Sequence, residues 1–392
     1  MKKRLLFLLV SLALSLVLAD RVLHSRIRDG HLGGLPIPPF GLQSTPQRQR
    51  ALQLRIASER VHVPYVVRGG FDARYGWVNR PGRYELGGVE HHINSIGARG
   101  ALEYAAQKFA GVVRMVCFGE SFTYGSEVAD TEAWPTRLAG LVEALEVINL
   151  AVSGWGTDQA LLRFREQGPG LDADVACMGF MLDNIRRNVN RYRQLAYPRD
   201  SGAPLVKPRF RLQRGELVLV PIPYATHLEL LEASYLGTMR EQMQRGDHWA
   251  GFDPSPAWSG FASVLAGLRH KRLQKLPRLW SRTEEEPFRV TLALLEAFHR
   301  EALAAGVRVP LVVIFPTFED LRDHGSETRP YWHTLHDELE IRGVPYLDVT
   351  SALAVSAAPQ ELYLATHLNP RGNSVVAAAV AAWLRERLPE LR

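Results

Sequence analysis

The amino-acid sequence predicts an α/β fold in which a mostly parallel sheet carries helices on both faces. From about residue 112 onwards, short apolar runs rich in β-branched residues alternate with longer segments of helical patterning. This alternation is typical of consecutive βαβ units. The chain has 392 residues, of which 46% are hydrophobic, so it is long enough to bury a large core.

Five strands and their connecting helices follow from this pattern in chain order. The strands are expected at residues 112–118, 146–152, 174–180, 309–315 and 345–349. Helices are expected at residues 134–144, 159–166, 287–305, 329–343 and 374–387. Asp158 is expected to cap the second of these helices. Residues 192–286 interrupt the alternation, and we interpret them as an inserted, lid-like segment.

The N-terminal residues predict a signal peptide or a membrane anchor over residues 1–22. Lys2, Lys3 and Arg4 form a basic start, and residues 5–19 contain no charged side chain. Such a short apolar run suits a signal peptide, whose cleavage would follow Ala19. It also suits an uncleaved anchor whose basic flanks extend its reach. Both alternatives place the bulk of the chain outside the cytoplasm, in the periplasm or at the cell surface.

Residues 23–100 are expected to form a linker rich in Gly and Pro, followed by a small β-rich lead-in with short β-like pieces such as residues 61–67. Residues 101–392 are expected to form the main domain. The formal net charge of +6 is modest and the chain contains no dense basic block, which argues against a nucleic-acid partner. Membrane contact is expected only through the N-terminal segment.

No metal or other cofactor is expected. His91 and His92 are adjacent, but no further ligands follow them at a metal-binding spacing. Cys117 and Cys177 each lie inside an apolar strand-like run, where cysteines are usually small buried hydrophobic residues.

The end of the first predicted strand is the stretch around which the other elements are organised. Its apolar run stops at Gly119, Ser121 follows two positions later, and a second glycine follows at Gly125. This pattern predicts a strand that enters a tight turn at the carboxyl edge of the sheet, where open α/β sheets bind ligands. Backbone N–H groups at such a turn can face a developing negative charge. We therefore predict that Ser121 is a nucleophile.

Three further loops at the same edge carry the residues that a serine nucleophile requires. His367, in the loop before the last helix, is the candidate base that removes the serine proton. Gly154 follows the second strand and can present its backbone N–H, and Asn184 follows the third strand and can present a side-chain amide. Together with the N–H of Ser121, these two groups are predicted to form an oxyanion hole.

The chain order Ser, Gly, Asn, His in four sheet-edge loops resembles the SGNH hydrolases, also called the GDSL esterase/lipase superfamily. Residues 119–125, 149–154 and 367–373 are similar to three of the family's sequence blocks, with Glu120 where Asp is usual. The resemblance extends from about residue 94 to the C-terminus, apart from the insertion. It implies a flavodoxin-like three-layer α/β/α sandwich with a five-stranded sheet, and a Ser–His site without a metal.

Two positions depart from the family's pattern. Asp183 and Asn184 stand in inverted order relative to the usual Gly-x-Asn-Asp, and we favour Asn184 over Asn188 as the amide donor. Leu364 stands three residues before His367, where the family commonly has Asp. The carboxylate that would orient the histidine is therefore either missing or supplied from elsewhere in the chain.

The sequence thus favours an extracytoplasmic serine esterase that hydrolyses or transfers short O-acyl groups. The resemblance suggests O-acetyl groups on an envelope polysaccharide as the substrate, with water or a sugar hydroxyl as the acceptor. The alternative is a non-catalytic, carbohydrate-binding relative that kept the cleft and lost the full catalytic set. The sequence leaves the oligomeric state open.

Overall fold

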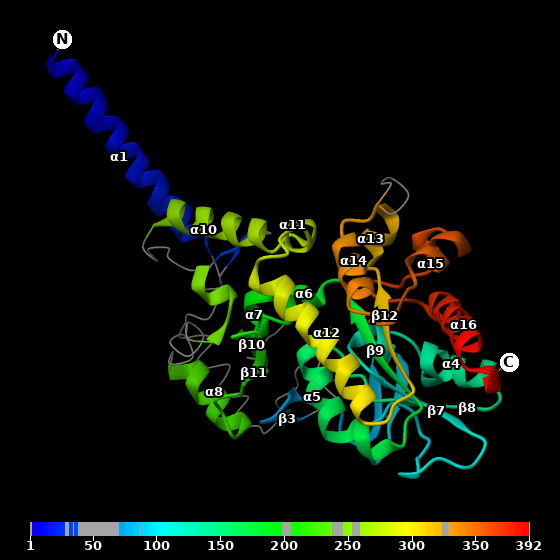
Figure 1. The fold of residues 1–392 in the computed structure, drawn as a ribbon. Helices are drawn as coiled ribbons and strands as arrows, with labels where there is room; N and C mark the ends of the chain where they lie inside the picture. Colours follow the sequence, from blue (N-terminus) through cyan, green and yellow to red (C-terminus); the bar gives the residue numbers. More distant parts are fainter. Residues whose placement is uncertain are drawn as a thin grey trace. The chain divides into compact units, whose positions relative to one another are not determined.

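The computed structural model describes residues 2–27, 31–33, 35–37, 70–86, 88–197, 205–236, 246–252, 259–323 and 329–391, so the β-like piece expected at residues 61–67 lies outside it. The chain, drawn as a ribbon in Figure 1, divides by its internal contacts into two compact units. Unit 1 comprises Met1–Val61, Asn190–Val206 and Thr226–Lys275. Unit 2 comprises His62–Val189, Lys207–Ala225 and Leu276–Arg392.

Unit 2 is built around a five-stranded sheet in which every strand pair is parallel. Its strands are β7 (Val113–Phe118), β8 (Leu145–Asn149), β9 (Val175–Met181), β12 (Val309–Phe315) and β13 (Tyr346–Asp348). They lie side by side in the order β13-β12-β9-β7-β8. Numbered along the chain, this is the order 2-1-3-4-5 of flavodoxin-like folds, read from one side. The predicted fold class is confirmed.

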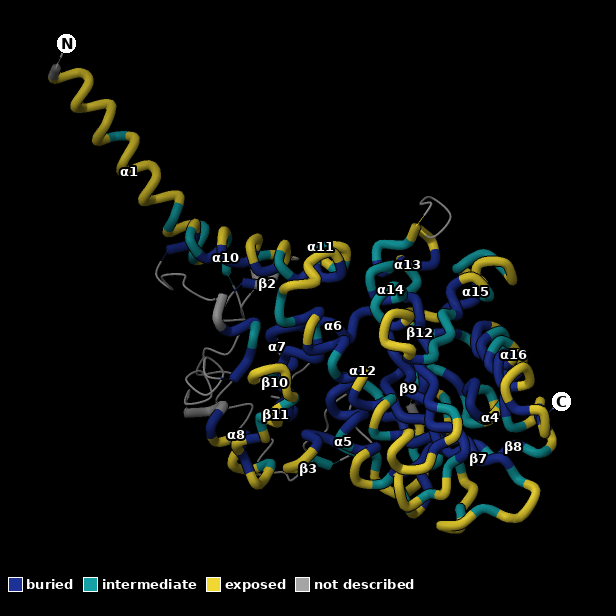
Figure 2. The backbone as a smooth tube through the Cα atoms, in the orientation of Figure 1, coloured by how far each residue is buried: buried dark blue, intermediate teal, exposed yellow. Residues whose placement is uncertain are grey.

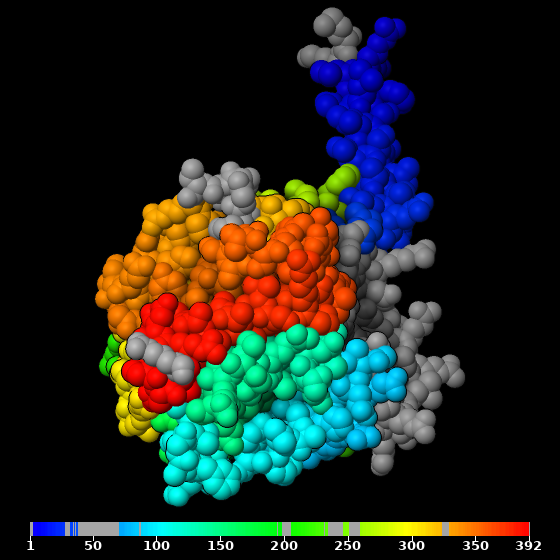
Figure 3. Space-filling view, turned by 90° about the vertical axis from the view of Figure 1, so that its right-hand side faces the viewer, coloured from blue at the N-terminus to red at the C-terminus, as the bar shows by residue number. Residues whose placement is uncertain are grey.

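Helices cover both faces of this sheet. On one face lie α5 (Thr157–Gln167) and α12 (Glu286–Ala304). On the other face α4 (Trp134–Leu141) packs against α16 (Pro370–Arg387), and Figure 3 shows these two helices side by side. Because both faces are covered, β7 and β9 are buried at every position (Figure 2). The three layers are therefore those of an α/β/α sandwich.

The expected cap at Asp158 is wrong. Helix α5 begins at Thr157 with Gly156 as its N-cap, so Asp158 lies inside the first turn. The Asp158 side chain is completely buried and forms an ion pair with Lys207. Burial raises the pKa of this carboxyl, while the charge of Lys207 opposes the rise. Asp158 therefore has a tertiary partner that the local pattern could not show.

Helix α16 begins at Pro370 rather than at the predicted residue 374, because Asn369 caps it. The Asn369 side chain accepts a hydrogen bond from Gly372 N at 3.0 Å. The loop that carries His367 does not follow the last strand directly, since helix α15 (Thr350–Ser356) intervenes. The loop nevertheless reaches the carboxyl edge of the sheet, where its contacts are described below.

Unit 2 contains further strands and helices outside the five-stranded sheet. Its lead-in contains two antiparallel pairs, β3 (Phe71–Asp72) with β4 (Gly76–Trp77) and β5 (Gly82–Leu86) with β6 (Val89–Ile93). A third antiparallel pair, β10 (Arg209–Gln213) with β11 (Glu216–Val220), forms a hairpin within residues 192–286. The helices are α3 (Ser121–Tyr124), α6 (Asn184–Arg187), α11 (Leu276–Ser281), α13 (Phe318–Asp323) and α14 (His333–Ile341). Short 3-10 helices lie at Asp130–Glu132, Gly168–Leu171, Pro359–Glu361 and Pro389–Leu391.

Unit 1 contains the N-terminal helix α1 (Lys2–Arg26). An 18-residue window within Lys3–Arg26 has a mean hydropathy of 2.2 and is exposed, which makes α1 the one described helix long and apolar enough to cross a membrane. The helix is longer than the apolar run seen in the sequence. The other elements of unit 1 are β1 (His31–Leu32), β2 (Leu35–Pro36), α7 (Arg193–Ala196), α8 (His227–Leu236), a 3-10 helix at Trp249–Phe252 and α10 (Gly260–Leu273).

Candidate active site

Ser121 lies where β7 ends, at the first residue of the short helix α3. This position faces the crevice between β7 and β9, where the strand order reverses and flavodoxin-like sheets bind ligands. The turn before Ser121 is tight. Gly119 has a φ of +152°, and a Cβ atom there would lie 3.0 Å from the carbonyl oxygen of Gly179. Only glycine fits this close approach to β9 without displacing backbone.

The Ser121 hydroxyl donates to a buried carboxylate. Glu120 is completely buried, and its Oε2 accepts hydrogen bonds from Phe122 N at 2.8 Å and from Ser121 Oγ at 3.2 Å. Burial raises the pKa of the Glu120 carboxyl, against the hydrogen bond from Phe122 and the nearby Arg187 and His367. Among the described residues, no hydrogen bond joins Ser121 to His367. Ser121 therefore holds its proton toward Glu120.

His367 is paired with a carboxylate from a distant part of the chain. Its Nδ1 lies 2.9 Å from Oε1 of Glu127. The hydroxyl of Thr366 donates to the same oxygen at 3.1 Å. Burial raises the pKa of the Glu127 carboxyl, but the hydrogen bonds with His367 and Thr366 outweigh burial and hold it below its usual value. An ionised carboxylate on Nδ1 favours the tautomer that leaves the lone pair of Nε2 to accept a proton.

The histidine loop lies beside the serine turn. The ring centroid of His367 is 5.3 Å from that of Phe122, the residue after Ser121. The loop is fixed from behind by Asn373, whose Nδ2 donates to Leu368 O at 2.9 Å and whose Oδ1 accepts from Trp134 N at 3.0 Å. The structure thus brings Ser121 and His367 to one edge of the sheet, as the sequence predicted.

Glu127 was not predicted as a site residue from the sequence; it lies six residues after Ser121 in the loop that follows α3. Arg99 holds this loop in shape. Its guanidinium donates to the carbonyl oxygens of Tyr124 at 2.7 Å and Val128 at 2.5 Å, and to Asp130 Oδ1 at 2.9 Å. The side chain is only 1% exposed, so these bonds are shielded from water. Because these bonds lie on both sides of Glu127 in the chain, they hold the backbone of the loop that carries it.

Gly154 lies in the turn after β8 with a φ of +81°, a conformation that favours glycine. The lead-in braces this turn. Trp77 Nε1 donates to Ser153 O at 3.0 Å, and Asn79 Nδ2 donates to Ala151 O at 3.1 Å. Ser126 Oγ, from the loop after α3, donates to Ser153 Oγ at 2.9 Å. The turn with Gly154 therefore adjoins the segment that carries the candidate nucleophile.

Asn184 begins α6 and is 1% exposed. Its Nδ2 lies 3.3 Å from Thr157 Oγ1, which engages one of the two amide N–H groups. Both the oxygen and the nitrogen of the Asn188 amide have partners within the protein. Its Oδ1 accepts a hydrogen bond from Thr157 N at 2.9 Å, and its Nδ2 donates one to Thr291 Oγ1 at 3.0 Å. This geometry favours Asn184 over Asn188 as the amide that faces a ligand.

The carboxylate of Asp183 would repel an oxyanion if it were unpaired. It forms an ion pair with Arg186, and Arg187 Nε lies 3.8 Å from its second oxygen. Asp183 is 4% exposed, so two neighbouring cations offset a charge that water cannot screen. The inverted Asp-Asn order is therefore compatible with a negative charge developing nearby.

The adjacent histidines have protein partners. His91 Nδ1 lies 3.3 Å from Tyr124 Oη, and His92 Nδ1 lies 2.7 Å from Asp130 Oδ2. No cluster of His, Cys, Asp or Glu able to hold a metal ion occurs within the described ranges. Cys117 and Cys177 are buried free thiols that face each other across β7 and β9.

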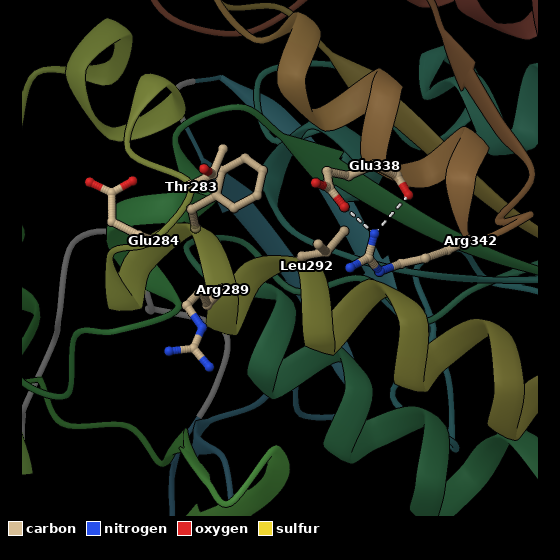
Figure 4. Close-up of a pocket in the computed structure, with 7 residues that line it drawn as sticks. Thr283, Glu284, Arg289, Leu292, Glu338 and Arg342 are labelled. Atoms are coloured by element: carbon tan, nitrogen blue, oxygen red, sulfur yellow. Dashed lines mark hydrogen bonds and ion pairs between the residues drawn. The ribbon is translucent and has the colours of Figure 1, made fainter.

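A pocket of about 400 Å³ lies away from these residues, on α12 and α14 (Figure 4). It is lined by Thr283, Glu284, Phe288, Arg289, Leu292, Glu338 and Arg342. Arg342 forms an ion pair with Glu338 within it. None of the candidate site residues lines this pocket, so we do not assign it to the same chemistry.

The sequence matches no protein-family model and no curated protein. Similar solved structures include an α/β hydrolase, LAE5, from the metagenome of Lake Arreo, with 14% identity, coverage of 70% of this chain and 95% of that chain, and a TM-score of 0.37. A putative lipolytic protein of the G-D-S-L family from Desulfitobacterium hafniense DCB-2 has 11% identity, covers 68% and 97%, and has a TM-score of 0.32. The acetylxylan esterase Axe2 from Geobacillus stearothermophilus has 11% identity, covers 69% and 93%, and has a TM-score of 0.35. Chemistry cannot be read from similarity at this level, so the functional argument rests on the residues at the sheet edge.

Proposed function

We propose that this chain is a serine esterase acting outside the cytoplasm, which hydrolyses or transfers short O-acyl groups. The observation that supports this most strongly is the carboxylate of Glu127 on Nδ1 of His367, next to the turn with Ser121. A serine, an imidazole and an orienting carboxylate at one sheet edge are the groups that acyl transfer requires. Leu364 stands where the family commonly has an orienting Asp. In the proposed site, Glu127 supplies that carboxylate from another loop.

In the proposed reaction, the Ser121 hydroxyl turns from Glu120 to Nε2 of His367, which takes its proton as Oγ attacks the ester carbonyl carbon. The backbone N–H groups of Ser121 and Gly154 and the amide of Asn184 stabilise the oxyanion. The C–O bond to the leaving alcohol then breaks, and His367 returns the proton to that alcohol. Water, or a sugar hydroxyl in a transferase, attacks the acyl-enzyme by the same route and releases Ser121.

The proposed substrate is an acylated carbohydrate, with O-acetyl groups on an envelope polysaccharide as the first candidate. Two features support this choice. The sequence resembles SGNH hydrolases, and helix α1 has the length and composition of a membrane anchor. An anchored enzyme would act on polymers close to the membrane.

The proposal is tested with a fluorophosphonate probe, which reacts with activated serines. The wild-type chain should be labelled and Ser121→Ala should not. Ser126→Ala is the control: it removes a neighbouring hydroxyl at the same edge but leaves Ser121 in place, so it should still be labelled. Hydrolysis of p-nitrophenyl acetate should exceed that of the octanoate ester. If the folded wild-type chain is labelled at neither neutral nor mildly alkaline pH, the esterase proposal fails. Binding of acetylated oligosaccharides without turnover would then support the non-catalytic alternative.

A further inference from the structure

The last turns of α1 pack against the first turn of α10. Asp20 Oδ1 accepts hydrogen bonds from Ser259 Oγ and Phe261 N, both at 2.8 Å. Gly260 lies against α1 so closely that a Cβ atom there would be 2.6 Å from Asp20 O. Figure 1 shows α10 at the base of α1, which projects away from it. Helix α10 therefore lies next to the end of the apolar helix.

This contact falls where a membrane surface would lie. Helix α1 has 25 residues, and at about 1.5 Å per residue it is longer than the hydrocarbon core, which is about 30 Å thick. The run without charged side chains ends at Ala19, and Asp20 is the first charged residue after it. Since Asp20 contacts α10, the start of α10 is held at the boundary between acyl chains and headgroups.

The outward face of α10 is apolar over its first half. Phe261, Leu265 and Leu268 are 43%, 66% and 51% exposed, and their spacing places them on one stripe of the helix. The opposite face is buried and includes Ser263, Ala266, Gly267 and His270. Exposure of three large apolar side chains to water, in one stripe of a short helix, is energetically unfavourable.

The same face becomes basic over its second half. Arg269, Lys271 and Arg272 are exposed, and α10 contains no acidic residue. On a helical projection Arg272 continues the apolar stripe, while Arg269 and Lys271 flank it on either side. An apolar stripe with cationic flanks is the pattern of helices that lie in the membrane interface and bind anionic headgroups.

The geometry points to α10 as an interfacial helix that lies on the bilayer beside α1 and inserts Phe261, Leu265 and Leu268 at the level of the acyl boundary. Arg269, Lys271 and Arg272 contact anionic phospholipid headgroups. The chain thus has two membrane contacts, one spanning and one lying flat, which fixes the orientation of unit 1 on the surface. This inference is independent of the chemistry proposed for Ser121.

The test measures how deeply α10 lies in lipid. The full chain is reconstituted in nanodiscs that contain phosphatidylglycerol, and a nitroxide label is placed at Leu268→Cys. The matched control is Leu228→Cys on α8, a leucine in unit 1 that is 50% exposed. Cys117 and Cys177 are completely buried and are not expected to react with the label. The ratio of oxygen to nickel-chelate accessibility should indicate lipid at position 268 and water at position 228.

Two further arms separate the alternatives. Replacing Arg269, Lys271 and Arg272 together by Gln should lower the ratio of docked to undocked α10 by about fivefold per charge, and only in the anionic discs. Equal, aqueous accessibility at positions 268 and 228 would overturn the inference. Dipolar broadening between two labelled copies in one disc, with no lipid accessibility, would also overturn it and assign the stripe to self-association.

Discussion

Replacing Glu127 by Gln keeps the size of the side chain and removes the charge that faces His367. In the proposed acyl transfer the His367 imidazole becomes an imidazolium, whose Nδ1 lies 2.9 Å from a Glu127 oxygen. At this separation the attraction is worth between about 1.4 kcal/mol in water and about 6 kcal/mol at a dielectric constant of about 20. The Glu127 side chain is 28% exposed, so water screens part of it. We expect a loss of about 3 kcal/mol, or roughly 10²-fold in kcat.

The assay is steady-state hydrolysis of p-nitrophenyl acetate by the full chain. The kcat should fall by this factor while KM changes little, because in the proposed reaction Glu127 acts through His367 and does not contact the substrate. Glu361→Gln is the matched control, since Glu361 precedes His367 by six residues but pairs with Arg371 at the surface. A Glu127→Gln variant within threefold of wild type, with the control unchanged, would refute the assignment of Glu127 as the positioning carboxylate.

Two further predictions concern the neighbouring groups. Asn184→Ala should lower kcat by about 10²- to 10³-fold because it removes a proposed oxyanion donor, whereas Asn188→Ala should mainly lower the melting temperature, and equal activity losses would contradict this division. Glu120→Gln tests the buried carboxyl, whose folded-state pKa is raised above its ordinary value of 4.5 by burial. In the wild type, the protonated Glu120 carboxyl contributes its full stabilisation of the fold below pH 4.5. This contribution is lost as the pH rises toward the folded-state pKa. The variant should therefore gain melting temperature over wild type above pH 4.5 and show no gain below it, and a pH-independent difference would count against the reasoning.

The positions of the strands could be predicted because they depend on local pattern. Strand β12 occupies the predicted residues, Val309–Phe315, and the other four strands of the sheet differ from prediction by a few residues at their ends. The turn at Gly119 could be predicted for the same reason, since a strand that stops at a glycine leaves few alternatives for the backbone. The sequence order of Ser121, Gly154, Asn184 and His367 then placed the candidate site, because parallel strands share one carboxyl edge.

Glu127 could not be predicted, although its residue type is suitable. It meets His367 across 240 positions of sequence, and no spacing rule connects the two loops. The loop that carries Glu127 is held by Arg99, which binds carbonyl groups on both sides of that residue. In the sequence, Arg99 was only part of the lead-in. Likewise, the ion pair between Lys207 and Asp158 replaced a cap that local pattern had favoured.

The sequence by itself determined the class of fold, the sheet edge of the candidate site, and the two loops, with Ser121 and His367, that lie beside each other at that edge. These follow from periodicity and from strand-end chemistry, which act over a few residues. Only the tertiary structure decided which carboxylate meets the histidine, how Asp183 is neutralised, and that α10 turns an apolar stripe outward beside α1. Those features depend on which distant side chains are packed together, and a pattern that repeats along the chain carries no information about such pairs.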